Sequence, residues 1–227
     1  MYLVAQKLIN QACKVIVIQA ENPDGDSLGS ALALEEILSV LGKEVKLYCP
    51  VEIPKYLRYI DGWDRVESDF STDADLAIIV DTTAELLLSK VLETPGARHF
   101  LESREVLVID HHTSAEPTLS FNHTLLLDEA AAASQVIYNL AESSHWYINK
   151  QAAKAMLTAL LSDTLGLTTQ NVNSKVYSTA AKLSDLGASP AEIEEKRRDF
   201  MKKSPKILEY KGKLIERIEY FLDGRLA

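Results

Sequence analysis

Acidic and histidine side chains recur after short apolar segments of this chain, in a pattern that suits metal chemistry. They are Asp24, Asp26, Asp81, Asp110, His111, His112 and Asp163. Carboxylate oxygens and imidazole nitrogens together are ligands for Mn²⁺ and similar divalent ions. Two carboxylates two residues apart can serve different ions, and a further carboxylate can bridge ions about 3.5–4 Å apart. The pattern therefore predicts a two-metal site of the kind that hydrolyses phosphoesters.

Each group also has a purely structural explanation when it is taken alone. The Asp24-Gly25-Asp26 segment is an ordinary turn, and Asp26 or Ser27 could cap the next helix. Asp81, followed by two threonines, could likewise begin a helix. Adjacent histidines after a buried strand are harder to explain by structure alone. Because the groups recur in order after three predicted strands, we favour a metal site over unrelated turns.

The elements that must position these residues alternate between strand and helix. The expected strands cover residues 14–19, 44–48, 76–80 and 105–109, with a further edge strand at 119–121. The expected helices cover residues 27–41, 129–141, 150–161, 174–186, 190–199 and 206–221. Continuous apolar runs suit strands that are buried on both faces of a parallel sheet. The predicted class is α/β, with a mostly parallel five-stranded sheet flanked by helices and a helical C-terminal portion.

This arrangement brings the candidate residues to one place. In open α/β sheets, ligands bind beyond the carboxyl ends of the strands. Asp24 and Asp26 follow the first expected strand, Asp81 follows the third, and the Asp110-His111-His112 triplet follows the fourth. We therefore expect these side chains to share one edge of the sheet.

Composition excludes several other classes of function. The chain has 227 residues and a formal net charge of -9, which argues against binding long duplex nucleic acid. No apolar run is long enough to cross a bilayer, and the N-terminus lacks the layout of a signal peptide. Cys13 and Cys49 are expected to be buried free thiols of a cytoplasmic protein, with a disulfide as the alternative. The sequence does not decide between a homodimer and a monomer.

The ordered motifs resemble the DHH phosphoesterase superfamily over nearly the whole chain. They are residues 22–30, Asp81, the triplet Asp110-His111-His112, residues 132–138 and residues 161–167. The likeness is to the N-terminal DHH domain, most of all to the branch of oligoribonucleases and 3′-phosphoadenosine 5′-phosphate phosphatases. It implies a DHH domain over residues 1–200 and a linker helix over 201–227. That helix would lead toward a C-terminal DHHA1-type substrate-binding domain that is missing here, and residues 223–227 look like a turn entering it.

The resemblance also implies a set of metal ligands. Two ions are expected, with Mn²⁺ as the first choice and Mg²⁺ or Co²⁺ as alternatives. Asp24 and Asp81 would hold one ion. The second would be held by Asp26, Asp81, His111 and Asp163, so that Asp81 bridges the two ions. A water between the ions would be the nucleophile, because the ions lower its pKa.

The remaining two residues of the triplet are assigned catalytic roles by the same resemblance. His112 would contact the phosphate or the leaving-group oxygen, and Asp110 would orient the histidine pair. One position departs from many members of the family. They carry a metal-binding histidine four residues before Asp24, where this chain has Ala20.

The function that the resemblance implies is a divalent-metal-dependent phosphoesterase that uses a metal-bridging water. Its substrates would be short oligonucleotides or small phosphorylated nucleotides, with no membrane partner. Ala20 and the missing domain motivate one alternative, a catalytically weakened domain that binds a nucleotide or a partner protein. A hydrolase of pyrophosphate or polyphosphate is the other alternative.

Overall fold

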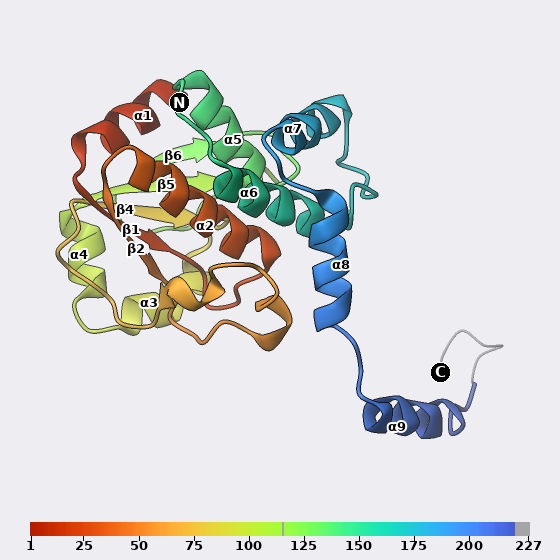
Figure 1. Ribbon diagram of the computed structural model, residues 1–227. Coiled ribbons are helices and arrows are strands. Elements are labelled where there is room, and N and C mark those ends of the chain that lie inside the picture. Colours follow the sequence, from red (N-terminus) through yellow and green to blue (C-terminus); the bar gives the residue numbers. More distant parts are fainter. Residues whose placement is uncertain (115, 221–227) are drawn as a thin grey trace.

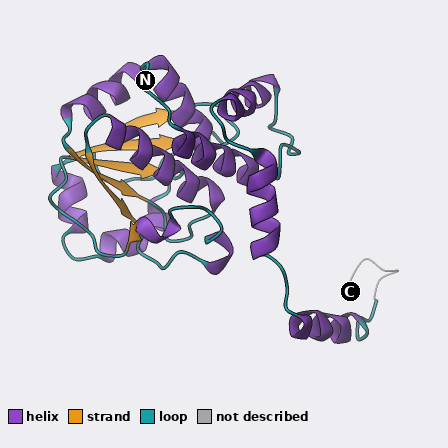
Figure 2. Ribbon diagram, in the orientation of Figure 1, coloured by secondary structure: helices purple, strands orange, loops and turns teal. Residues whose placement is uncertain are grey.

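The computed structural model describes residues 1–114 and 116–220. Within them, the strands form one six-stranded sheet in the order β3-β2-β1-β4-β5-β6 (Figures 1 and 2). Every neighbouring pair is parallel. The strands are β1 (Lys14–Ile18), β2 (Glu44–Tyr48), β3 (Val66–Glu67), β4 (Leu76–Val80), β5 (Glu105–Asp110) and β6 (Thr124–Leu127). The predicted α/β class is confirmed.

Both edges of the sheet differ from the prediction of five mostly parallel strands. The edge strand expected at residues 119–121 is wrong, because β6 begins at Thr124 and pairs Leu125 with Val108. Phe121 is buried in the core instead, so its apolar character reflects packing and not strand pairing. On the other edge, β3 has only two residues, which is too short to produce a recognisable apolar pattern.

Helices cover both faces of the sheet. They are α1 (Tyr2–Gln11), α2 (Gly25–Val40), α3 (Ser89–Glu93), α4 (Ala97–Ser103), α5 (Ala133–Ser143), α6 (Lys150–Asp163), α7 (Ser174–Asp185), α8 (Pro190–Phe200) and α9 (Pro205–Ile215). Helices α1, α3 and α4 were not predicted, and α5 begins four residues later than residue 129, where the prediction placed it. The prediction for α9 ran to residue 221, whereas the helix ends at Ile215.

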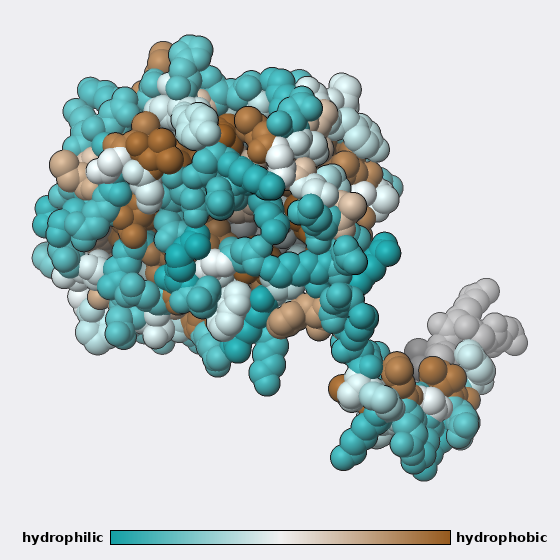
Figure 3. All heavy atoms as spheres, in the orientation of Figure 1, coloured by the Kyte–Doolittle hydropathy of each residue, from teal (hydrophilic) through white to brown (hydrophobic). Residues whose placement is uncertain are grey.

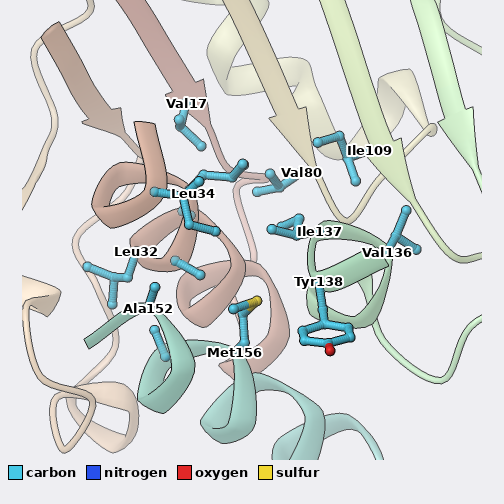
Figure 4. Close-up of a cluster of buried hydrophobic side chains, with 14 of the residues drawn as sticks. Val17, Leu32, Leu34, Val80, Ile109, Val136, Ile137, Tyr138, Ala152 and Met156 are labelled. Carbon is cyan, nitrogen blue, oxygen red and sulfur yellow. The ribbon is translucent and has the colours of Figure 1, made fainter. Parts of the chain in front are cut away.

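Two apolar layers lie on opposite faces of the sheet. Val15 and Val17 of β1 belong to the layer that contains α2, α5 and α6, whereas Ile16 and Ile18 belong to the layer that contains α3 and α4. This alternation is the two-residue period of a strand. Figure 4 shows the first layer, in which helices α2, α5 and α6 pack below β1, β4 and β5.

Helix α2 lies between the sheet and α6, and its first two turns are buried on every side. The two helices approach closely at Gly29. A Cβ at this position would lie 2.7 Å from the carbonyl oxygen of Ala155 and 2.8 Å from the Cβ of Ala159. Only glycine allows this approach without movement of a backbone, so the packing fixes where the N-terminus of α2 meets the sheet.

The C-terminal helices extend away from the sheet. Helix α9 lies apart from the rest of the molecule and has no buried residue (Figure 1). Figure 3 shows apolar side chains on its surface, among them Ile207, Leu214 and Ile215. Residues 223–227, predicted to be a turn that enters a strand, lie outside the described residues. No described helix is both long and apolar enough to cross a membrane.

Both cysteines are free, as predicted, but only one of them is buried. Cys49 follows β2 and is enclosed in the core, whereas Cys13 is exposed. The expectation that both thiols are buried is therefore wrong for Cys13. The unpredicted helix α1 explains the difference, because Cys13 lies in the turn between α1 and β1 and not within an apolar segment.

Candidate metal centre

The carboxyl ends of three neighbouring strands bring the candidate residues together. The pairing of β1 with β4 aligns Ile18 with Ile79, and the pairing of β4 with β5 aligns Val80 with Ile109. The loop after β1 leads to Asp24 and Asp26, β4 leads to Asp81, and β5 ends at Asp110. The parallel register thus places these groups at one edge, as the sequence predicted.

Asp26 is a fully buried carboxylate held by two helices. Its Oδ2 accepts a hydrogen bond from the backbone N–H of Ala133 at 2.6 Å. Its Oδ1 accepts bonds from the backbone N–H of Ser134 at 3.2 Å and from Ser30 Oγ at 3.1 Å. Burial raises the pKa of Asp26 to about 6, although the neighbouring His111 and these hydrogen bonds act in the opposite direction.

His111 directs one ring nitrogen at three carboxylates. Its Nδ1 lies 3.2 Å from the carbonyl oxygen of Ala130, which can only accept, so Nδ1 carries the proton. Nε2 is therefore the ring nitrogen that is available to a cation. Nε2 lies 3.5 Å from Asp81 Oδ1, 3.6 Å from Asp163 Oδ2 and 3.8 Å from Asp26 Oδ2. Asp81 follows β4, whereas Asp163 lies in α6 and Asp26 in α2, and all three carboxylates face Nε2 of one imidazole.

Asp81 lies in the turn directly after β4, beside both His111 and His112. Its backbone has a φ of 63°, in the left-handed region that Asp tolerates better than most residues. Its N–H donates to the carbonyl oxygen of Ile109 at 2.9 Å, which fixes the turn after β4. Burial raises its pKa well above the ordinary value, and the charges of Asp26 and Asp24 raise it further. An ionised Asp81 therefore needs a cation beside it.

Asp110 holds the two histidines in place. Its Oδ1 accepts bonds from the backbone N–H of His111 at 2.7 Å, from that of His112 at 3.2 Å and from His112 Nδ1 at 2.7 Å. Burial alone would raise the pKa of Asp110, but the hydrogen bond and charge of His112 lower it overall. The same hydrogen bond raises the pKa of His112, whose ring is 53% exposed at the mouth of the site.

Asp24 has a structural role that the sequence left open. Its Oδ1 accepts from the backbone N–H groups of Asp26 at 3.0 Å and Ser27 at 2.9 Å, and Ser27 Oγ accepts from the N–H of Asp24 at 2.9 Å. The N-cap of α2 is therefore Asp24, and not Asp26 or Ser27. Nearby Ala20 is buried and offers no ligand side chain.

The donor atoms fit divalent cations. Within the described ranges, two groups of side chains have ligand atoms within 4.8 Å of one another: Asp26, His111 and Asp163, and Asp81, Asp110, His111 and His112. Asp24 belongs to neither group. Six buried side-chain atoms have no hydrogen-bond partner among the described residues, and three of them belong to these two groups: Asp81 Oδ1, Asp110 Oδ2 and His111 Nε2. Buried polar atoms are normally paired, so unpaired oxygen and nitrogen donors directed at one point indicate a cation site.

Several residues that build the site were not assigned a role from the sequence. The N-terminus of α5 supplies the two backbone N–H groups that bind Asp26, where the helix dipole favours a negative charge. The carbonyl oxygen of Ala130 sets the tautomer of His111. The run of small residues before α5 was the available signal, because small side chains let a backbone approach a buried carboxylate.

The fold and this donor set define an α/β protein with a candidate carboxylate–histidine metal site at the carboxyl edge of a parallel sheet. The chain belongs to the DHH family, because the family model for the DHH N-terminal domain matches residues 14–162. The resemblance inferred from the motifs is therefore confirmed.

Named relatives agree with this assignment. The chain is 27% identical over 233 residues to the bifunctional oligoribonuclease and PAP phosphatase NrnA of Thermus thermophilus, covering 100% of this chain and 66% of that protein. It is 25% identical over 179 residues to a probable manganese-dependent inorganic pyrophosphatase of Enterococcus faecalis, covering 76% of this chain and 55% of that protein. This chain thus spans between about half and two thirds of the length of these relatives.

A solved structure shows the same fold. An exopolyphosphatase-related protein from Bacteroides fragilis superposes with a TM-score of 0.82 at 21% identity, covering 97% of this chain and 66% of that one. At 21% sequence identity, this similarity is evidence for the fold alone. It extends over nearly all of the chain, including its helical C-terminal portion.

Proposed function

We propose that this chain is a divalent-metal-dependent phosphoesterase that hydrolyses short oligonucleotides or small phosphorylated nucleotides. The observation that carries the proposal is the direction of His111 Nε2, a buried ring nitrogen that faces the carboxylates of Asp81, Asp163 and Asp26. A buried histidine with a purely structural role would be paired at both nitrogens. Here one nitrogen is paired with a carbonyl oxygen and the other faces only acceptors.

In this proposal, one cation position is formed by Asp26, Asp81, His111 and Asp163. Burial raises the pKa of Asp163 as well, so this position concentrates carboxylates whose negative charge a cation would offset. Mn²⁺, Mg²⁺ or Co²⁺ bound there would lower the pKa of a water molecule and neutralise phosphate charge.

The second position would use Asp24 together with Asp81. It is the weaker of the two, because Asp24 is exposed and one of its oxygens caps α2. Ala20 adds no donor to it. We therefore expect the two positions to differ in affinity, with the position around His111 filled first.

Asp110 and His112 supply the proton chemistry. Asp110 fixes the ring of His112 through Nδ1, so the Nε2 of His112 faces the open side of the site. A histidine held in this way, with a raised pKa, suits donation of a proton to the departing oxygen of a phosphoester. Asp110 acts as a positioning residue for His112.

Similarity to the relative from Thermus thermophilus supports a nucleotide substrate, because the name of that protein describes oligoribonuclease and PAP phosphatase activities. The test is hydrolysis with Mn²⁺ of three substrates: the dinucleotide pApA, 3′-phosphoadenosine 5′-phosphate and inorganic pyrophosphate. We expect turnover of the first two and little of the third. Turnover of pyrophosphate alone would show the activity named for the relative from Enterococcus faecalis and would overturn the proposal.

A second candidate is a catalytically weakened domain that binds nucleotide without turnover. The capping role of Asp24 and the apolar Ala20 favour it, because both reduce the ligands available for one ion. Mn²⁺ titration by calorimetry separates the two candidates. Two binding events with turnover support the enzyme, whereas one event with nucleotide binding and no turnover supports the weakened domain.

A further inference from the structure

Three exposed apolar side chains stand on segments that contact the loop after β1, which carries Asp24. They are Tyr56, which is 50% exposed, Leu86, which is 80% exposed, and Leu165, which is 74% exposed. A single exposed leucine is ordinary on a protein surface. Here Tyr56 and the segment of Leu86 are hydrogen-bonded to this loop, and Leu165 follows Asp163 by two residues, so all three belong to segments that border the candidate metal centre. Apolar surface beside a polar site marks a binding surface.

Tyr56 is tied to this loop directly. Its hydroxyl donates a hydrogen bond to the carbonyl oxygen of Pro23 at 3.3 Å, one residue before Asp24. The bond fixes one end of the side chain while half of the residue stays exposed to solvent. The exposed cation Lys55 precedes it in the same short helical turn.

Leu86 belongs to the helical turn Glu85–Leu88, which follows β4 and Asp81. This turn contacts the loop through its backbone. The carbonyl oxygen of Leu87 accepts a hydrogen bond from the backbone N–H of Glu21 at 3.0 Å. The backbone beside Leu86 is therefore fixed to the loop, yet the side chain of Leu86 remains exposed.

Leu165 comes two residues after Asp163. Its N–H donates to the carbonyl oxygen of Ser162 at 3.3 Å. Ser162 itself packs against the start of α2 so closely that a Cβ on Gly25 would overlap its side chain. The backbone of Leu165 has a φ of 47°, in the left-handed region that is unfavourable for leucine, and such strain gathers at functional sites.

We propose that Tyr56 is the stacking platform for a nucleobase of the substrate, with Leu86 and Leu165 as apolar neighbours at the rim. The inference rests on the proposed function and names the feature that selects nucleotides over inorganic phosphates. With a phosphate at the metal centre, the attached nucleoside must lie outside it, and Tyr56 contacts the residue directly before Asp24. An aromatic ring held by its hydroxyl presents a flat face to any base, so the contact does not depend on base sequence. Lys55 is placed to meet a neighbouring phosphate of an oligonucleotide.

The test compares two ligands that differ by the base alone. Adenosine 5′-monophosphate and ribose 5-phosphate are titrated calorimetrically, with Mn²⁺ present, into the unmodified chain. We expect adenosine 5′-monophosphate to bind about tenfold more tightly or better, which is the ordinary contribution of one stacked base. Tyr56→Ala should remove most of this preference without changing the affinity for ribose 5-phosphate. Tyr56→Phe, which keeps the ring but loses the bond to Pro23, should retain more of the preference than Tyr56→Ala.

Tyr147→Ala is the matched control, because Tyr147 is 68% exposed and lies before α6, at the end of that helix opposite Asp163. It should leave both affinities unchanged. Leu165→Ser gives a second variant in case Tyr56→Ala is poorly folded, and it should reduce the preference more weakly. Equal affinity of the unmodified chain for the two ligands, or no binding of either, would overturn the inference. Failure of hydrolysis with an intact base preference would instead count against the proposed function alone.

Discussion

The Nε2 atom of His111 lies 3.5 Å from Oδ1 of Asp81, and neither atom has a hydrogen-bond partner among the described residues. The two residues follow neighbouring parallel strands, β5 and β4. Both side chains are buried, so water cannot freely satisfy them. An imidazole nitrogen and a carboxylate oxygen that face each other in this way can share one cation. Four predictions test this site and the fold that forms it.

Replacement of Asp81 by asparagine should separate its charge from its backbone role. Asn tolerates the left-handed conformation at a φ of 63°, so Asp81→Asn should fold normally. We expect Mn²⁺ affinity to fall at least about tenfold. The metal-free variant should be more stable near neutral pH, because a buried carboxylate whose pKa is raised well above its ordinary value is removed. Calorimetry and urea unfolding measure the two effects, and unchanged Mn²⁺ binding would exclude Asp81 as a ligand.

His111 and His112 should have different roles, the first in metal binding and the second in catalysis. His111→Gln should lose Mn²⁺, because Nε2 of His111 is the nitrogen that faces three carboxylates. His112→Gln should keep Mn²⁺ but lower kcat on pApA by about 10²–10⁴-fold, the usual contribution of a general acid or base. Metal content by mass spectrometry, measured beside kcat, distinguishes them. Equal loss of metal in both variants would contradict the separate roles.

The close approach of α2 and α6 should make Gly29 irreplaceable. A methyl group there would meet the backbone of Ala155 at 2.7 Å, so Gly29→Ala should lower the free energy of unfolding by about 1–3 kcal/mol. Gly212→Ala on α9 is the matched control, because a Cβ there has open space and the helix gains propensity. Urea titration of both variants measures the difference. If Gly29→Ala were as stable as Gly212→Ala, the helix packing described here would be wrong.

The two cysteines should react at very different rates. Cys13 is exposed, whereas Cys49 is enclosed and burial raises its pKa to about 11. Little thiolate therefore exists at Cys49 near pH 8, and the reagent cannot reach it. Ellman's reagent should titrate one thiol in the native protein and two after denaturation in guanidinium. Cys13→Ser should leave no thiol that reacts in the native state, and fast reaction of that variant would contradict the enclosed position of Cys49.

The central strands could be predicted from sequence because their apolar runs are continuous. Residues 76–80 and 105–109 are strands within one residue of the expected bounds. The edges could not be predicted, since β3 pairs through only two residues and β6 is half-exposed. Short edge strands depend on what lies beside them more than on their own residues. Helix α5 began late for a similar reason: the N–H of Ala131, before the helix, binds the side chain of Gln135, and the N–H of Ala133, the first residue of the helix, binds Asp26.

By itself, the sequence determined which residues could do chemistry and that they stand at one edge of a parallel sheet, because residue type and strand order are local properties. Only the tertiary structure decided which of them meet. Asp26 is held by backbone N–H groups 107 and 108 residues away, and His111 faces carboxylates from three other elements. Asp24, equal to the others in sequence, became the cap of α2. These roles follow from how α2, α5 and α6 cross the sheet, which no local pattern records.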